Sequence, residues 1–186
     1  MLDSIVSMMC IPISHYLLTG IAAERHGNAS PSTRVSPNNT YQLTDGYVQI
    51  MAVSEKNYQS FCRALGHEEW LSDPLFATRD TREEHGPKLD TLVAAELALK
   101  TVAEVMELME GAGVPCGPIK NVPQVVADPQ VRAREMIVEV DHPTLGAWPL
   151  QGITVKMSKT PGEVRTPPPV LGAHNEEVYG GLLGYS

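Results

Sequence analysis

The 186-residue sequence is poor in cysteine and lacks the paired cysteine spacings that bind zinc. Its three cysteines, Cys10, Cys62 and Cys116, are an odd number, which argues against a disulfide framework. The sequence also lacks a Walker loop, a GxGxxG turn, a GxSxG elbow and an HExxH pair. These absences argue against a nucleotide-binding enzyme, a serine hydrolase and a metalloenzyme. We expect no metal and a reducing, cytoplasmic compartment.

Basic residues are also scarce, with 14 Lys and Arg against 22 Asp and Glu and a net charge of −8. The range 41–140 holds nine of the basic and 16 of the acidic residues, so nearly all of the excess lies there. Since an acidic surface repels a phosphate backbone, we expect no nucleic-acid binding. Asp3, Pro12 and His15 interrupt the apolar range 1–20, which no basic segment precedes, so we expect neither a signal peptide nor a membrane span.

Apolar periodicity and turn-forming residues divide the chain into three predicted parts. The first, 1–40, is an amphipathic helix over about 2–20, bent by Pro12, and then a linker rich in Asn, Ser and Pro. The second, 41–140, is a compact middle. The third, 141–186, is a return strand, a proline-rich arm and a C-terminal helix.

The middle part has the alternating signals of an α+β fold. The range 47–53 is rich in β-formers and predicts a half-buried strand. Helical periodicity recurs over 58–65 and 87–99, and Thr101 with Glu104 forms a capping box that starts a further helix. We therefore expect a small domain in which a short mixed or antiparallel sheet packs on helices.

The remaining elements are predicted from proline positions and β-rich runs. The range 114–119 has too many prolines for a central strand and is expected at a sheet edge. Asp128, which precedes a proline, is expected to cap a short helix. The ranges 136–141 and 148–155 predict a hairpin, and 174–183 predicts a last short helix.

Cys116 and His174 are the candidate catalytic groups, and neither is favoured. Cys116 has no evident basic neighbour or helix N-terminus to lower its pKa, so a small buried hydrophobic role is the better interpretation. His174 is followed by Glu176 and Glu177. Solvated charged residues are common at the start of a helix, so this arrangement does not require a catalytic role for His174. We predict no catalytic residue in this chain.

Four short motifs occur in an order that is similar to a known family. They are DPLFAT at 73–78, GVPCGP at 113–118, DPQV at 128–131 and RTPPPVLG at 165–172. Together they resemble the class III CoA transferases, also called CaiB/BaiF, which include formyl-CoA:oxalate and carnitine CoA transferases and the α-methylacyl-CoA racemases. The resemblance spans the whole chain but only part of the family pattern. It implies a small domain with both connecting arms, without the N-terminal Rossmann-like large domain.

The resemblance implies a role in acyl-CoA metabolism. In the family's transferases an aspartate of the large domain attacks an acyl-CoA thioester, giving an anhydride and then an enzyme-CoA thioester. That aspartate has no counterpart here. The substrates implied for the full-length protein are a CoA thioester and a small carboxylic acid, and the implied assembly is an interlocked homodimer.

Gly27, Asn28 and Ser30 are the site residues that the resemblance implies, because they match the loop that enters the small domain and lies at the active site. They are the expected contacts to coenzyme A or its acyl thioester. Ser and Pro replace the glycines that some members have in this loop, which makes the backbone stiffer. Near the other end, Ala173 stands where many members have Glu.

Three hypotheses stay open from the sequence. The chain is the C-terminal part of a family III CoA transferase that is inactive alone, or a non-catalytic binding or oligomerisation module built on the same small domain. The third is a fragment of an α-methylacyl-CoA racemase, since the discriminating residues are expected upstream.

Overall fold

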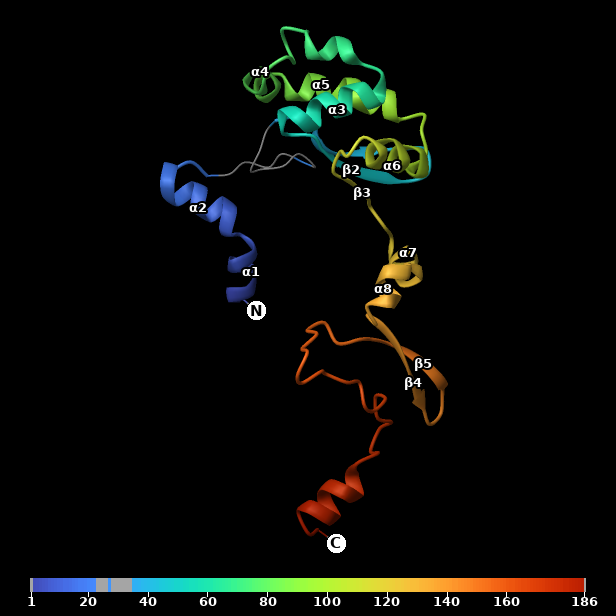
Figure 1. The fold of residues 1–186 in the computed structure, drawn as a ribbon. Helices are drawn as coiled ribbons and strands as arrows, with labels where there is room; N and C mark the ends of the chain where they lie inside the picture. The colour runs from blue at the N-terminus through green and yellow to red at the C-terminus, as the bar shows by residue number, and fades with distance from the viewer. Residues whose placement is uncertain (1, 23–26, 28–34, 186) are drawn as a thin grey trace. The chain divides into compact units, whose positions relative to one another are not determined.

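The computed structural model describes residues 2–22, 27 and 35–185. The chain divides into two compact units, one ending at Ile119 and the other beginning at Lys120 (Figure 1). We call them unit 1 and unit 2 and treat each by itself. The predicted middle, 41–140, crosses this division, because its limits came from charge and turn residues and not from contacts between distant residues.

The N-terminal apolar range forms two helices, α1 (Leu2–Met8) and α2 (Cys10–Thr19), with no buried residues. The break lies one turn before Pro12, which has no N–H for the Met8 carbonyl and whose ring crowds that carbonyl. The predicted bend is therefore present and sharper than expected. Among the described helices none is alone long and apolar enough to cross a membrane, although α1 and α2, bent by 69°, pass that test together.

Unit 1 contains a three-stranded antiparallel sheet with the order β1-β2-β3. Its strands are β1 (Asn38–Gln42), β2 (Tyr47–Met51) and β3 (Cys116–Pro118). Val48 and Ile50 of β2 are fully buried and alternate with exposed or partly exposed neighbours. β3 lies at the edge of the sheet, as predicted. β1 begins inside the predicted linker. Its sequence does not predict a strand, because only Tyr41 of its five residues is both apolar and buried.

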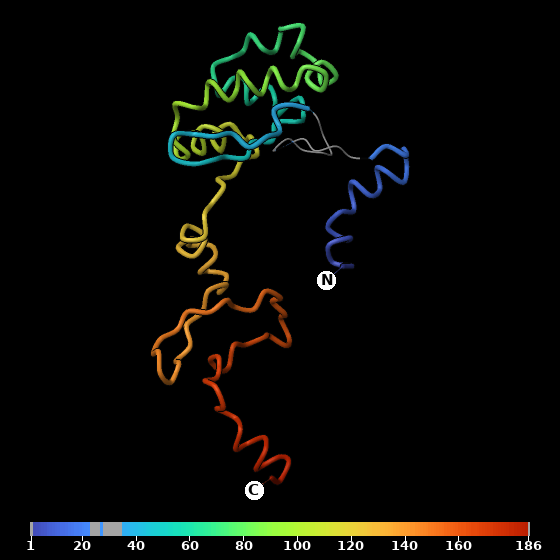
Figure 2. Tube along the Cα trace, turned by 180° about the vertical axis from the view of Figure 1, so that it is seen from behind, coloured from blue at the N-terminus to red at the C-terminus, as the bar shows by residue number. Residues whose placement is uncertain are grey.

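Helices α3 (Glu55–Leu65), α5 (Gly86–Leu97) and α6 (Val102–Gly111) cover the same side of this sheet (Figures 1 and 2). The shorter η1 (Glu68–Leu71) and α4 (Arg79–Glu84) connect α3 to α5. The predicted helix caps are confirmed, with Gly66 ending α3 and the Thr101 capping box starting α6. The buried core consists of Tyr41, Leu43, Val48, Ile50, Ala52, Tyr58, Phe61, Cys62, Trp70, Phe76, Leu89, Val93, Leu97, Val105, Met109 and Val114.

Unit 2 has much less buried surface. It contains α7 (Val122–Ala127), α8 (Pro129–Ala133), β4 (Ile137–His142), β5 (Gly146–Gln151) and η2 (Glu176–Leu182). The Asp128 cap and the β4-β5 hairpin are confirmed. Of the residues described in unit 2, Gly152 alone is buried. The fold is thus α+β, with two short antiparallel sheets and a well-formed core in unit 1.

Candidate functional site

Of the three residues implied as contacts to CoA, Gly27 is described by the structure, whereas Asn28 and Ser30 lie outside the described residues. Gly27 is exposed and has a φ of +62°, a left-handed conformation that L side chains rarely adopt. A Cβ at this position would meet nothing within 4 Å. Backbone conformation therefore explains glycine here better than close packing does.

The chain becomes firmly packed where it reaches the small domain, in a stretch that we call the lead-in segment, residues 35–41. Val35 and Ser36 are 1% and 3% exposed, and the Ser36-Pro37 peptide bond is cis. The Pro37 carbonyl accepts a 2.8 Å hydrogen bond from the Ala52 N–H just beyond β2. The lead-in segment is therefore held to the sheet even before β1 begins.

A single carboxylate, that of Asp90 on α5, accepts hydrogen bonds from three side chains of the lead-in segment. Asp90 Oδ1 accepts from Ser36 Oγ at 2.5 Å and from Tyr41 Oη at 2.6 Å, and Asp90 Oδ2 accepts from Asn39 Nδ2 at 3.1 Å. Hydrogen bonds to an ionised acceptor are shorter and stronger than neutral ones. The three bonds fix the lead-in segment to α5.

Burial and the nearby carboxylate keep the Tyr41 phenol of this cluster protonated. Burial raises the pKa of the Tyr41 phenol well above its usual value, and the adjacent Asp90 carboxylate raises it further. The Tyr41 phenol therefore stays protonated, and a hydrogen-bond donor, at neutral pH. Such a group holds a segment in place and is poorly suited to proton transfer near neutral pH.

The cysteines of unit 1 that are wholly or partly buried are poor nucleophiles. Burial raises the pKa of the Cys116 thiol, and its Sγ lies 3.7 Å from Met106 Sδ. Burial also raises the pKa of Cys62 to about 11. Both side chains are therefore thiols, not thiolates, at neutral pH, which supports the hydrophobic role predicted for Cys116.

His174 has the solvated surroundings that its sequence neighbours suggested. Its Nδ1 lies 3.1 Å from Glu177 Oε2, and both side chains are mostly exposed. Within residues 2–22, 27 and 35–185, no group of three or more His, Cys, Asp or Glu is arranged to hold a metal ion. The described residues thus supply a framework and no evident set of reacting groups.

Sequence reasoning missed two polar features that are partly or fully buried, the Asp90 cluster and Arg82. Asp90 lies 49 to 54 residues from its partners, and Arg82 lies 27 residues from Glu55, with which it pairs. Neither pairing leaves a periodic or short-range signal. A weak signal exists for Asp90, which lies three residues before Val93 and seven before Leu97 and so falls on the apolar face of the predicted helix.

Comparison with known proteins decides the family. The sequence model of CoA-transferase family III matches residues 1–175. The chain belongs to CoA-transferase family III. It is 36% identical over 98% of its length to the succinyl-CoA–D-citramalate CoA-transferase of Chloroflexus aurantiacus, and 29% identical over 100% of its length to the human succinyl-CoA:glutarate CoA-transferase.

The family III chain spans less than half the length of these relatives, 45% of the first and 42% of the second. It corresponds to the C-terminal portion of a family member. A CaiB/BaiF family protein from Brucella suis, 26% identical, superposes on 95% of the chain and 45% of its own length with a TM-score of 0.80. The fold of the chain is thus that of a CaiB/BaiF family member.

Proposed function

We propose that this chain is the C-terminal part of an enzyme that moves CoA from an acyl-CoA thioester to a free carboxylic acid. The observation that carries the proposal is the family match over residues 1–175, together with 36% identity to a protein named as a succinyl-CoA transferase. Relatives named as formyl-CoA:oxalate CoA-transferases, 31% identical over 90% of the chain, support the same reaction class. The whole enzyme, and not this chain alone, determines which acyl group and which acceptor acid react.

In this proposal the reacting carboxylate lies in the remainder of the enzyme. That carboxylate displaces CoA thiolate from the thioester and forms a mixed anhydride with the acyl group. The thiolate then attacks the enzyme's half of the anhydride, which releases the acyl group as a free carboxylate and leaves an enzyme-CoA thioester. The acceptor acid repeats the two steps in reverse and leaves as the new thioester.

The present chain supplies the small domain and its connecting arms. Gly27, Asn28 and Ser30 are proposed to lie at the acyl-CoA site, and the lead-in segment joins them to the small domain. We further propose a homodimer that works in cytoplasmic acyl-CoA metabolism without a metal, and without nucleic acid or membrane as a partner. The net charge of −8 supports the absence of a nucleic-acid partner, and the lack of a metal-binding pattern in the sequence supports the absence of a metal.

The test is to join the chain to the coding sequence upstream of it and to assay CoA exchange. Succinyl-CoA is the donor, and citramalate, glutarate and oxalate are separate acceptors, with new thioesters measured by mass spectrometry. We expect exchange with at least one acid, and none from the 186-residue chain alone. Exchange with no acid overturns the transferase proposal, and deuterium uptake at Cα of a 2-methylacyl-CoA then favours a racemase.

A further inference from the structure

His67 connects two helical elements of unit 1 through its two ring nitrogens. It follows Gly66, the C-cap of α3, and its carbonyl accepts a 3.2 Å hydrogen bond from the Trp70 N–H of η1. Its Nδ1 lies 2.7 Å from Glu69 Oε1 on η1, and its Nε2 lies 3.6 Å from Glu96 Oε2 on α5. The imidazole therefore lies between two carboxylates that belong to different elements.

The core of unit 1 holds the His67 ring in one orientation. The ring stacks on Trp70, with 4.3 Å between the ring centroids and 4° between the planes. Trp70 is 7% exposed and belongs to the hydrophobic core, so the stacked face is fixed. The His67 side chain is 30% exposed, which lets it exchange protons with solvent. A change of protonation therefore acts on the contacts of a ring that stays in place.

The protonation state of the ring decides which carboxylate contacts are favourable. The imidazolium carries a proton on both nitrogens, so Nδ1–H donates to Glu69 while Nε2–H and the positive charge attract Glu96. The neutral ring has one proton, and the shorter contact to Glu69 keeps it at Nδ1. Nε2 then presents a lone pair to the Glu96 carboxylate, and two acceptors that face each other repel.

Other charged groups near the ring leave Glu96 a place to go. Lys100 Nζ lies 3.2 Å from Glu96 Oε1, so Lys100 holds this carboxylate when His67 releases it. On the α3 side, Arg63 pairs with Glu68 at 3.9 Å, and both of these side chains are exposed. The contact between the ring and Glu96 is thus the one that changes with protonation.

The direction of the pH effect follows from the two carboxylates. The hydrogen bond to Glu69 raises the pKa of His67, partial burial opposes this rise, and the hydrogen bond to Glu96 adds to it. The pKa in the folded chain is therefore higher than in the unfolded chain. The contact with Glu96 is complete below a pH of about 6.5 and is lost as the pH rises through the folded pKa.

We propose that His67 and Glu96 form a pH-dependent latch between η1 and α5, closed when both ring nitrogens carry a proton and open when Nε2 has lost its proton. The two carboxylates lie on opposite nitrogens of the ring, and the described residues hold no metal-binding group, so a proton fits this site better than a metal. η1 leads directly into the motif at 73–78, because the Asp73 N–H donates to the Glu69 carbonyl at 3.1 Å. Opening of the latch thus loosens the start of this motif.

The first test follows the fluorescence of Trp70 in the 186-residue chain with Trp148→Phe, in which Trp70 is the remaining tryptophan. An imidazolium stacked on an indole quenches its fluorescence more strongly than a neutral imidazole does, so a scan from about pH 5 to pH 9 titrates His67. We expect a midpoint above about 6.5 and no such transition in His67→Gln. Glu96→Gln should lower the midpoint by about half a unit.

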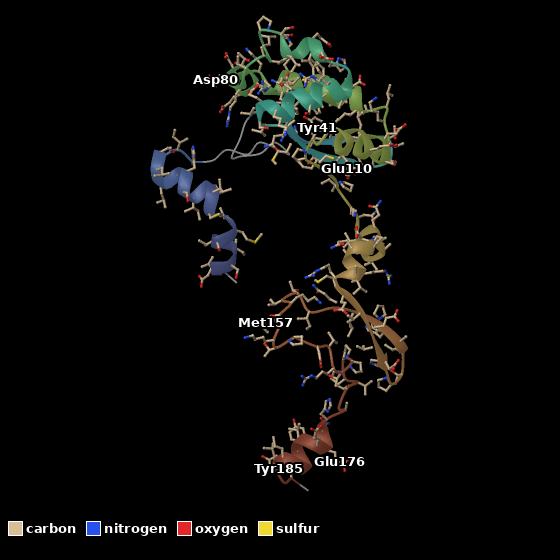
Figure 3. All side chains as sticks on the ribbon, viewed as in Figure 1. Tyr41, Asp80, Glu110, Met157, Glu176 and Tyr185 are labelled. Atoms are coloured by element: carbon tan, nitrogen blue, oxygen red, sulfur yellow. The ribbon has the colours of Figure 1, made fainter. Side chains whose placement is uncertain are left out.

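Asp80→Asn is the matched control for Glu96→Gln, because it also removes one negative charge from a helix of unit 1. Asp80 is an exposed acid in the first turn of α4 (Figure 3). We expect this variant to keep the midpoint of the parent. Equal midpoints in the parent and in Glu96→Gln would show that Glu96 does not hold the ring, and this result overturns the proposal.

Hydrogen exchange then tests whether loss of the proton opens the latch. The reporters are the amides of Trp70, Ser72 and Asp73, which donate the hydrogen bonds of η1. We expect their protection factors, which are corrected for the intrinsic pH dependence of exchange, to fall severalfold from about pH 6 to pH 8. In Glu96→Gln they should be low at both pH values, and Asp80→Asn should behave as the parent.

Two results of the exchange experiment would overturn the latch. One is equal protection of the η1 amides at both pH values in the parent, even where the fluorescence titrates. The other is an equal fall in the amides of α6, since a shared fall reports a loss of global stability and not a local opening. A fall confined to η1 and its surroundings, and absent in His67→Gln, supports the proposal.

Discussion

Replacing Glu55 by Gln removes the negative charge that pairs with Arg82, the least solvated charged side chain that the structure describes in unit 1. Arg82 is completely buried, and its Nη2 lies 2.5 Å from Glu55 Oε1. Its Nη1 donates to the Phe76 carbonyl at 3.0 Å, and its guanidinium lies 4.0 Å from the centre of the Tyr58 ring. Gln keeps the shape of Glu55 and removes its negative charge, so the change isolates the charge on the partner.

The expected cost lies between two known limits. Breaking a fully buried ion pair costs about 3–5 kcal/mol, whereas an exposed pair contributes about 0–1 kcal/mol. Glu55 is about half exposed at 54%, and Arg82 keeps the carbonyl and the ring. We therefore expect a loss of about 2 kcal/mol in the free energy of unfolding, or roughly 8 °C in Tm for a domain of this size.

The assay uses a Trp148→Phe background, in which Trp70 of the unit 1 core is the remaining tryptophan and reports unfolding in urea. Part of the loss comes from the favourable placement of Glu55 in the first turn of α3, so the change is repeated in Arg82→Met. We expect a coupling of at least about 1 kcal/mol between the two positions. Glu68→Gln, whose 3.9 Å pair with Arg63 is exposed, is the control and should change nothing measurable. An equal cost of Glu55→Gln with and without Arg82 would refute the reasoning.

Three further changes have defined outcomes. Gly152→Ala places a Cβ 1.9 Å from the Glu135 carbonyl oxygen, so in the full-length protein we expect unit 2 to lose about 2 kcal/mol, read from the urea midpoint of Trp148 fluorescence. Thr101→Ala removes the N-cap of α6 and should cost about 1 kcal/mol by the Trp70 signal. The hydrogen bond to Glu69 raises the pKa of His67 above 6.5, so its contribution is present below pH 6.5 and is lost as the pH rises through the folded pKa. Urea midpoints between pH 6 and 8 should show this fall in the parent and a smaller one in Glu69→Gln.

The elements that the sequence predicts correctly are those specified by neighbouring residues. The Thr101-Glu104 capping box and the Asp128 cap are each complete within four residues, and both occur as expected. Gly66 ends α3 in a left-handed conformation that glycine adopts without strain. Such signals need no knowledge of distant parts of the chain, because the groups that satisfy the helix ends are adjacent in sequence.

The features that sequence reasoning missed depend on partners far along the chain. β1 has the sequence NNTYQ, with no apolar alternation, and its existence depends on the ladder with β2 and on the Asp90 bonds. Arg82 reads as a surface residue in a charged helix, yet it is buried because Glu55, Phe76 and Tyr58 converge on it. Only contacts between distant residues distinguish these partly or fully buried polar groups from ordinary exposed ones.

The uneven burial of the two units bears on how the chain is to be studied. Unit 1 buries a cluster of apolar side chains large enough to supply a cooperative core. Among the residues described in unit 2, only Gly152 is buried, and it contributes no apolar side chain. Hydrophobic burial is the main favourable term in folding, so unit 2 has little of its own to oppose the loss of chain entropy. The unfolding of the isolated chain should therefore report mainly on unit 1. The effect of the remaining part of a family III enzyme is better sought in unit 2, as a rise in the urea midpoint of Trp148 when the full-length protein replaces the chain.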